Sequence, residues 1–237
     1  MLYLIGLGLN YDSISSYGLE ITKRCKKIYL ENYTVDFPYS LQQLKDVIGK
    51  NIIPADRDFV EKFEIIDQAK KCNVALLIYG SPLTATTHIS LIQEAKASGI
   101  KYQIIYNASI FDAVGETGLQ LYKFGKIASM PAWKKNYEPD SFMEIVKQNL
   151  ASQAHSLILI DIGLEFPEAL EQLEKAAKKH DLKLKKLIIC QRLGARYHKV
   201  LYRDFEEMKT FTGIEKPYCL IFPSKLHFVE KEFLEGL

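Results

Sequence analysis

Residues 73–118 read NVALLIYGSPLTATTHISLIQEAKASGIKYQIIYNASIFDAVGETG. The apolar run Val74–Tyr79 predicts a buried strand that ends at the turn Gly80–His88. A helical pattern then leads to a second predicted strand, Tyr102–Tyr106, which ends in the polar stretch Asn107–Ser109. In open α/β sheets, ligands bind just outside the carboxyl ends of the strands. We therefore expect these two strand ends to lie side by side and to form a binding crevice.

The composition is that of a soluble globular protein with an ordinary core. Of the 237 residues 48% are hydrophobic and 25% are charged, which is enough for one large domain or two modest ones. The net charge is only +2, and the densest basic run, Lys175–Lys186, is interrupted by His180 and Asp181. A dedicated nucleic-acid binder shows a clustered basic stripe, so we interpret this run as a solvated face and expect no direct nucleic-acid partner.

Cysteine usage and hydropathy exclude several classes. The four cysteines are scattered without a C-x-x-C pair, so we predict reduced thiols and no metal site. No run approaches the ~18 apolar residues of a membrane span. The apolar start, Met1–Ile5, has no basic region before it and does not resemble a signal peptide. We expect a cytoplasmic protein without a membrane partner.

The chain opens with a strand, a glycine turn and a helix, which is the start of a βαβ unit. After Met1–Ile5 comes Gly6-Leu7-Gly8-Leu9, but Tyr11 occupies the place of the third glycine of a G-x-G-x-x-G fingerprint. A dinucleotide-dependent oxidoreductase is therefore the last of the functions considered. We interpret these glycines as positions where the backbone passes close to a ligand.

Strands and helices alternate in the first half of the chain and lose this regularity in the second. The pattern predicts a parallel sheet followed by a mixed sheet, in two α/β domains, 1–110 and 111–237, with a crevice between them. We expect a helix over Ile110–Phe124, interrupted by glycine. We expect another over Ser141–Ala154, with Ser141 and Glu144 forming a capping box.

Five motifs in order along nearly the whole chain carry a family resemblance. They are MLYLIGLGL (1–9), GSPLTATTH (80–88), NASIFDAVGETGLQLYKFGK (107–126), LIDIG (159–163) and FPSKLHFVE (222–230). Together they resemble the diphthine synthase family, methyltransferases of the tetrapyrrole-methylase-like superfamily. The second and third motifs are the most specific, whereas GLGL alone would carry little weight.

The resemblance implies a fold, a cofactor and a substrate. It implies two α/β domains with S-adenosyl-L-methionine in the cleft between them, S-adenosyl-L-homocysteine as product, and usually a homodimer. It implies successive methylation of an amine on the modified histidine of translation elongation factor 2. By position, the family's cofactor contacts fall on Leu9, Ser81, Thr84, Ser109, Ile110, Ile160, Leu193 and Tyr218. The aliphatic members of this set would contribute backbone groups, because their side chains form no hydrogen bonds.

Two positions depart from the family pattern. The family turn is usually G-D-P, and here Ser81 stands between Gly80 and Pro82. A hydroxyl in place of a carboxylate costs about 1 kcal/mol or more of cofactor affinity, because charge-assisted bonds are roughly twice as strong as neutral ones. Tyr218 replaces the usual histidine before the last predicted strand, and the segment between Ile162 and Leu187 is short. These changes bear on cofactor affinity and not on the fold.

No catalytic residue is assigned, because methyl transfer from a sulfonium depends mainly on orientation and on a neutral acceptor amine. His88 and His227 are either substrate-side groups or partners of their local turns, and we favour the second interpretation. Asp161 is either a carboxylate at the crevice or one held by neighbouring N–H groups. We expect at least one of the threonines at positions 84, 86 and 87 to cap the helix that follows.

A methylated ammonium product would suit an aromatic wall, through cation–π attraction. Tyr79, Tyr106 and Trp133 are the candidates, although most aromatic residues here belong to the core. We predict a substrate-side contact for Trp133 because it lies in a long polar loop.

Two further functions stay open on the sequence. One is a methyltransferase of the same superfamily that acts on a tetrapyrrole. The other is a degenerate, non-enzymatic relative that binds protein or nucleotide, a possibility raised by Ser81 and Tyr218.

Overall fold

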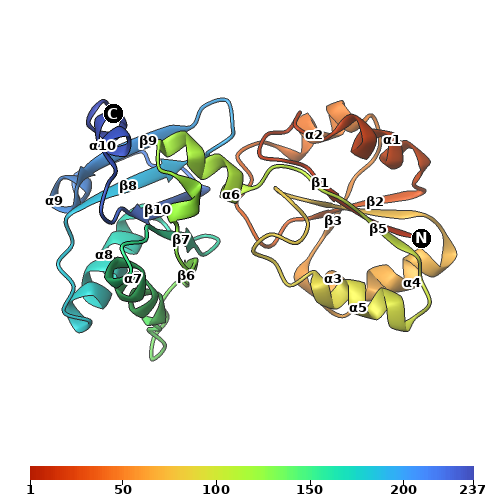
Figure 1. The fold of residues 1–237 in the computed structure, drawn as a ribbon. Helices are drawn as coiled ribbons and strands as arrows, with labels where there is room; N and C mark the ends of the chain where they lie inside the picture. The colour runs from red at the N-terminus through yellow and green to blue at the C-terminus, as the bar shows by residue number, and fades with distance from the viewer. The chain divides into compact units, whose positions relative to one another are not determined.

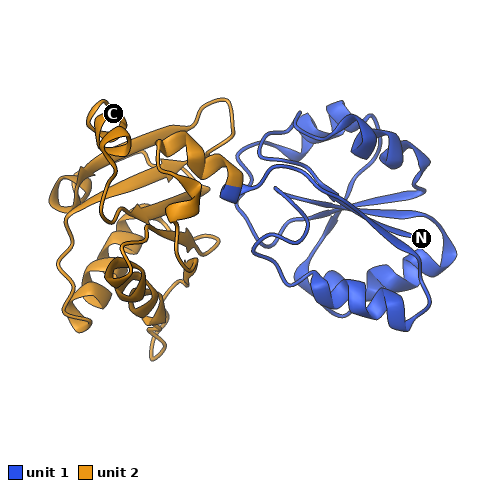
Figure 2. Ribbon diagram, viewed as in Figure 1, with its two compact units in different colours: residues 1–111 blue, residues 112–237 orange.

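The computed structural model describes all residues, 1–237, and the chain divides into two compact units (Figure 2). Unit 1 comprises Met1–Phe111 and unit 2 comprises Asp112–Leu237. Each unit has its own five-stranded sheet and its own core.

Unit 1 is built on a fully parallel sheet of strand order β3-β2-β4-β1-β5 (Figure 1). Its strands are β1 (Leu2–Gly6), β2 (Lys27–Glu31), β3 (Ile53–Ala55), β4 (Val74–Ile78) and β5 (Tyr102–Ile105). The helices between them are α1 (Ser16–Arg24), α2 (Leu41–Ile48), α3 (Arg57–Glu61), α4 (Glu64–Lys71) and α5 (Ile89–Ala97). The parallel sheet expected for the first half of the chain is confirmed.

Both faces of this sheet are buried, which explains why its central strands read as continuous apolar runs. Leu4 and Leu76 pack on one face with residues of α4 and α5, and Ile5 and Leu77 pack on the other with residues of α1 and α2. The two groups of helices flank the sheet in Figure 1. Neighbouring residues of one strand thus serve opposite cores, as the pleat requires.

One expectation about this sheet is wrong. β4 and β5 are not neighbours, because β1 lies between them and pairs with both. The N-terminal strand fills the centre of the sheet, a non-local pairing that spacing along the sequence does not reveal. The edge where β4 and β5 end therefore also contains the glycine turn that follows β1.

Unit 2 has a mixed sheet of order β6-β7-β10-β8-β9, in which only β6 and β7 are parallel. Its strands are β6 (Ala128–Met130), β7 (Ser156–Ile160), β8 (Lys186–Gln191), β9 (Lys199–Asp204) and β10 (Tyr218–Phe222). Its longer helices are α7 (Ser141–Ala151), α8 (Phe166–Lys179) and α10 (Phe228–Glu235), with a short α9 (Phe205–Met208). The mixed sheet predicted for the second half is confirmed.

The helix expected over Ile110–Phe124 is wrong in its length. The segment forms three short pieces, α6 (Ile110–Ala113) and the 3₁₀ turns η1 (Val114–Thr117) and η2 (Leu121–Lys123). Gly118 ends η1 in a left-handed conformation, with φ +76°, and a Cβ built there would lie 2.3 Å from Cδ1 of Phe233 in α10. The chain turns at this glycine so that α10 can pack closely.

The capping box expected at Ser141 is also wrong. Asp140 is the N-cap of α7, and Ser141 is already its first helical residue. Asp140 forms no side-chain cap, whereas His180 Nε2 lies 3.4 Å from its Oδ1. A tertiary partner of the carboxylate thus replaces the local cap.

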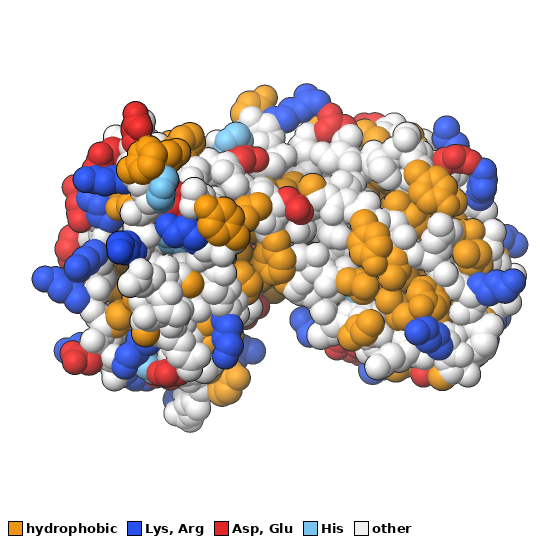
Figure 3. Space-filling model, viewed as in Figure 1, with side chains coloured by type: hydrophobic (Ala, Val, Ile, Leu, Met, Phe, Trp, Pro, Cys, Tyr) orange, Lys and Arg blue, Asp and Glu red, His pale blue; other side chains and the backbone are white.

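No helix of the structure is both long enough and apolar enough to cross a membrane. On the face shown in Figure 3, acidic and basic side chains are interspersed over both units.

Candidate functional site

The candidate site in unit 1 lies at the carboxyl edge of the parallel sheet, where two glycine turns join. Gly8 N donates to Gly80 O at 3.1 Å, and Gly80 N donates to Gly8 O at 2.9 Å. Both glycines are left-handed, with φ +70° and φ +69°. A Cβ built on Gly6 would lie only 2.7 Å from Gly80 O. We expected the backbone at these glycines to pass close to a ligand. In this structure it passes close to the backbone of the other glycine turn.

Two polar side chains tie this edge together from the neighbouring strand ends. Asn107, which follows β5, donates from Nδ2 to Gly6 O at 3.1 Å and to Ser13 O at 2.8 Å. The hydroxyl of Tyr79, which follows β4, donates to Leu9 O at 3.2 Å. The ends of β4, β1 and β5 thus form one hydrogen-bonded edge.

Five of the residues predicted to bind the cofactor lie at this edge. Leu9, Ser81 and Ser109 are buried, and Thr84 and Ile110 are half-buried. Ser109 Oγ accepts a hydrogen bond from Phe111 N at 3.2 Å. A Cβ on Gly80 would lie 3.6 Å from the Cα of Ser109, so the Gly80 turn and Ser109 are in direct contact.

The other three predicted cofactor residues lie together at one end of the sheet of unit 2. Ile160 ends β7 and Tyr218 begins β10, next to one another in the antiparallel ladder. Tyr218 pairs with Gln191 at the end of β8, two residues before the buried Leu193. The Tyr218 hydroxyl donates to Leu164 O at 3.1 Å, so its phenol helps to hold the loop after β7.

Comparison with known proteins identifies the family of this chain. A family model described as Tetrapyrrole (Corrin/Porphyrin) Methylases matches residues 1–209. A Methanocaldococcus jannaschii protein named diphthine synthase is 35% identical over 254 residues, which cover 100% of this chain and 98% of that protein. An Arabidopsis thaliana protein named probable diphthine methyl ester synthase is 34% identical and is covered to 97%.

The chain belongs to the diphthine synthases.

A solved structure supports this membership. The crystal structure of a putative diphthine synthase from Entamoeba histolytica superposes with a TM-score of 0.90 at 30% identity, covering 100% of this chain and 97% of that one. A Schizosaccharomyces pombe diphthine methyl ester synthase is 41% identical over 184 residues, which are 76% of this chain and 65% of that protein. The resemblance stated from the motifs is confirmed, and so is the tetrapyrrole-methylase-like α/β fold.

The histidine of the diphthine synthase turn motif, His88, is a partner of its own turn. Its side chain is buried, and Nδ1 lies 3.1 Å from Pro82 O. The favoured interpretation of His88 is confirmed. His227 is exposed, and its backbone N–H donates to Glu230 Oε2 at 2.7 Å.

The capping role expected for the threonines of this motif is wrong. α5 begins after His88 without any side-chain cap. Thr86 Oγ instead donates backward to Pro82 O at 3.1 Å, and Thr87 O accepts from Ser90 Oγ. The Thr86 hydroxyl thus stabilises the turn itself and does not cap the helix.

Asp161 follows the second of the two alternatives considered for it. Its Oδ1 accepts from Ile162 N at 3.0 Å and its Oδ2 accepts from Ala132 N at 3.1 Å. The residue is exposed, and its carboxylate ties the loop after β6 to the end of β7.

The three aromatic candidates lie in different surroundings. Tyr79 belongs to an aromatic cluster of unit 1, with its ring 5.4 Å from that of Phe37. Tyr106 is 63% exposed. Trp133 packs against the core of unit 2, its Nε1 donates to Pro139 O at 2.9 Å, and Lys179 Nζ lies 5.1 Å from its ring. Contact of Trp133 with a substrate stays a prediction.

Two buried polar clusters were missed by the sequence reasoning. In unit 1, Glu31 ends β2 and lies beside His88. In unit 2, Glu230 is surrounded by Lys123, His155 and the backbone N–H groups of Gln120 and His227. The only sequence signal for the first is a glutamate that directly follows the apolar residues 28–30 of β2, and nothing in the sequence shows that these partners meet.

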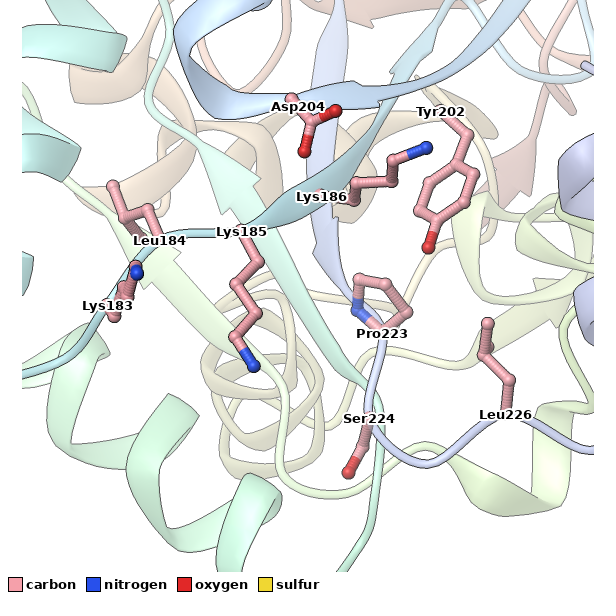
Figure 4. A pocket seen from close by; sticks show the side chains of 9 residues that line it. All are labelled: Lys183, Leu184, Lys185, Lys186, Tyr202, Asp204, Pro223, Ser224 and Leu226. Atoms are coloured by element: carbon pink, nitrogen blue, oxygen red, sulfur yellow. The ribbon is translucent and has the colours of Figure 1, made fainter.

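A hollow of about 430 Å³ in unit 2 is not part of the predicted site (Figure 4). It is lined by Lys185 and Lys186 at the start of β8, by Tyr202 near the end of β9 and by Pro223 just after β10, among others. The predicted cofactor residues of unit 2 lie toward the opposite ends of β8 and β10. No group of three or more His, Cys, Asp or Glu residues is placed to hold a metal ion.

Proposed function

We propose that this diphthine synthase is an S-adenosyl-L-methionine-dependent methyltransferase that methylates the modified histidine of translation elongation factor 2. The observation that carries the proposal is the hydrogen-bonded edge of unit 1, with its two glycine turns and buried hydroxyls, in a chain matched over nearly its full length by diphthine synthases. Homodimeric assembly and cytoplasmic location are parts of the same proposal. The first rests on the family resemblance and the second on the expectation drawn from the sequence.

The chemistry of this edge fits the proposed cofactor. S-adenosyl-L-methionine has an amino-acid end, ribose hydroxyls and an adenine ring, all of which form hydrogen bonds. Ser81, Thr84 and Ser109 supply hydroxyl groups, and Leu9 and Ile110 supply backbone N–H and C=O groups. From unit 2 the proposed contacts are Ile160, Leu193 and Tyr218.

The bound cofactor supplies a methyl group already activated on a sulfonium and leaves as S-adenosyl-L-homocysteine. The chain must hold donor and acceptor in line and exclude water, which is catalysis by orientation. The turn at Gly80 and the helix start at Ser109 are suited to this task because each is held by hydrogen bonds within unit 1. An acceptor nitrogen must also lose a proton, and we assign that proton to no side chain.

The alternatives raised by the sequence are not favoured. The family model is named for tetrapyrrole methylases, but the curated relatives from Methanocaldococcus jannaschii and Arabidopsis thaliana are named for diphthine.

The first test is calorimetric titration of the full chain with S-adenosyl-L-methionine and S-adenosyl-L-homocysteine. We expect micromolar binding that Ser109→Leu abolishes, because the new side chain would fill the space beside the Gly80 turn. Ser98→Leu is the matched control, since Ser98 is the C-cap of α5 and lies at the opposite edge of the sheet. Absence of binding up to millimolar ligand would overturn the proposal.

The second test measures methyl transfer to elongation factor 2 whose modified histidine has not yet been methylated. Radioactive methyl groups from the cofactor should appear on the modified histidine. The relatives from yeast and human are named diphthine methyl ester synthases, so the product should also be treated with mild base. Release of label would indicate an ester and retention would indicate N-methylation, whereas no transfer despite cofactor binding would favour the non-enzymatic alternative.

A further inference from the structure

A glutamate and a histidine meet in the interior of unit 1, directly behind the turn of the proposed cofactor site. Glu31 is the last residue of β2, and His88 immediately precedes α5. Their side chains are 0% and 2% exposed, and His88 Nε2 lies 4.0 Å from Glu31 Oε1. Neither carboxylate oxygen of Glu31 has a well-formed hydrogen bond within the protein.

The other ring nitrogen of His88 determines how this pair is protonated. His88 Nδ1 lies 3.1 Å from Pro82 O, and a carbonyl oxygen only accepts. Nδ1 therefore carries a hydrogen. In the neutral ring Nε2 then has a lone pair, which faces the carboxyl group of Glu31. The two groups attract only if one proton lies between them, on Nε2 or on the carboxyl oxygen.

We propose that Glu31 and His88 are positioning residues that together carry one proton, as a buried pair without net charge, and thereby hold the turn Gly80–Thr84 in its ligand-binding form. Few contacts connect Glu31 to this turn. Glu31 is anchored in the sheet, His88 bonds Pro82 O, and Pro82 lies between the predicted cofactor residues Ser81 and Thr84. The inference rests on the proposed function, because it requires this turn to be part of the cofactor site.

The surroundings support a pair without net charge. Burial raises the pKa of Glu31 to about 7, although the Thr34 hydroxyl and the Arg57 charge act in the opposite direction. Burial lowers the pKa of His88, opposed by its bond to Pro82 O and by Glu61.

The remaining charged and titratable neighbours are on and beside α3. Arg57 and Glu61 belong to this helix, and the Arg57 guanidinium lies 5.1 Å from the ring centre of Tyr33. Burial raises the pKa of Tyr33, so its phenol stays neutral over the working range. Below about pH 7 the pair is therefore a protonated carboxyl group beside the lone pair of Nε2, and above that pH the carboxyl group is ionised.

The sign of the pH dependence follows from these directions. The pKa of Glu31 is raised on folding, so its contribution is complete at low pH and is lost as the pH rises through about 7. Above that pH the buried carboxylate of Glu31 faces the lone pair on Nε2 of His88. The two groups then repel one another, and His88 no longer stabilises the turn. The pKa of His88 is lowered, so its contribution is lost when the pH falls below its ordinary value of 6.5. The support of the turn is therefore greatest between these limits.

The experiment measures the pair with and without ligand. Without ligand, ¹⁵N NMR of the histidine rings should show a hydrogen on Nδ1 of His88 and a titration near pH 7 that disappears in Glu31→Gln. With S-adenosyl-L-homocysteine, the wild-type dissociation constant should rise about tenfold between pH 6.5 and pH 8, since only the protonated fraction supports the turn. Glu31→Gln should bind with nearly constant affinity over this range, because its amide is neutral at every pH of the range and the buried pair never gains a charge.

A second pair of variants keeps the test decisive if Glu31→Gln does not fold. His88→Asn retains a donor for Pro82 O but does not reach Glu31, so it should also lose the pH dependence. His227→Gln, at an exposed histidine of unit 2, should behave as the wild type. A wild-type pH profile in either Glu31→Gln or His88→Asn, or an Nδ1 without hydrogen, would overturn the inference. Absence of any cofactor binding would instead overturn the proposed function, because the NMR measurement requires no ligand.

Discussion

His155 Nε2 lies 3.2 Å from Glu230 Oε1, and both side chains are completely buried in unit 2. Ser224 N donates to His155 Nδ1 at 2.9 Å, so the hydrogen of the neutral ring is on Nε2 and is donated to Glu230. Lys123 also pairs with this carboxylate. The contacts join η2, the start of β7 and the N-terminus of α10, which gives the family motif at residues 222–230 a structural role.

Glu230→Gln should destabilise unit 2 by about 3 kcal/mol, because it leaves the Lys123 ammonium without its buried partner. Trp133 is the only tryptophan and lies in unit 2, so its fluorescence during urea unfolding reports this unit alone. Glu235→Gln is the matched control on the same helix, since the pair Lys231–Glu235 is exposed and should contribute less than about 1 kcal/mol. Equal effects of the two substitutions would contradict the role given to Glu230.

The same cluster predicts that unit 2 loses stability in acid. Burial alone would raise the pKa of Glu230, but bonds from Lys123, Gln120 N, His227 N and His155 outweigh it and lower the pKa to about 2. A lowered pKa means that the contribution is present above 4.5 and is lost as the pH falls toward 2.

Burial lowers the pKa of His155, so its contribution to the stability of unit 2 begins to be lost as the pH falls below 6.5. The unfolding free energy from Trp133 fluorescence should therefore decline from pH 6.5 downward. Glu230→Gln should remove the part of this decline that occurs below pH 4.5. If the unfolding free energy of the variant declines there as steeply as that of the wild type, other groups are responsible.

Gly6→Ala should separate the end of β1 from the Gly80 turn. The added Cβ would lie 2.7 Å from Gly80 O and 2.9 Å from Asn107 Cβ, and neither is the end of a flexible side chain. Overpacking of this kind costs about 1–3 kcal/mol, and we expect at least a tenfold loss of S-adenosyl-L-homocysteine affinity by calorimetry. Gly115→Ala should leave that affinity unchanged, because its Cβ would meet only Leu121 at 4.0 Å.

Ser81→Asp should strengthen cofactor binding, because it restores the acidic residue that the family turn usually has. A charge-assisted bond in place of a neutral one should contribute about 1 kcal/mol, or roughly a fivefold lower dissociation constant. Ser81→Ala should weaken binding and shows whether the native hydroxyl contributes. If Ser81→Asp binds more weakly than Ser81→Ala, the buried carboxylate has no partner and Ser81 is not a cofactor contact.

The sequence by itself determined the order and type of most elements, because the signals are local. Apolar runs such as Val74–Ile78 and Leu220–Phe222 form strands, and the loss of regular alternation after residue 110 separates the parallel sheet from the mixed one. The family was also readable, because the motifs around Gly80 and Asn107 are short and contiguous. Local predictions were wrong where a tertiary contact replaced a local one, as when Asp140 paired with His180 and did not cap α7.

Only the tertiary structure decided which residues meet. Chain order cannot show that β1 inserts between β4 and β5, since these pairings join Leu2 to the distant residues Val74 and Tyr102. For the same reason the sequence hides that Glu31 faces His88 and that Glu230 lies against Lys123 and His155. A buried charged group is stable only beside a partner, and the fold brings that partner from a distant part of the chain.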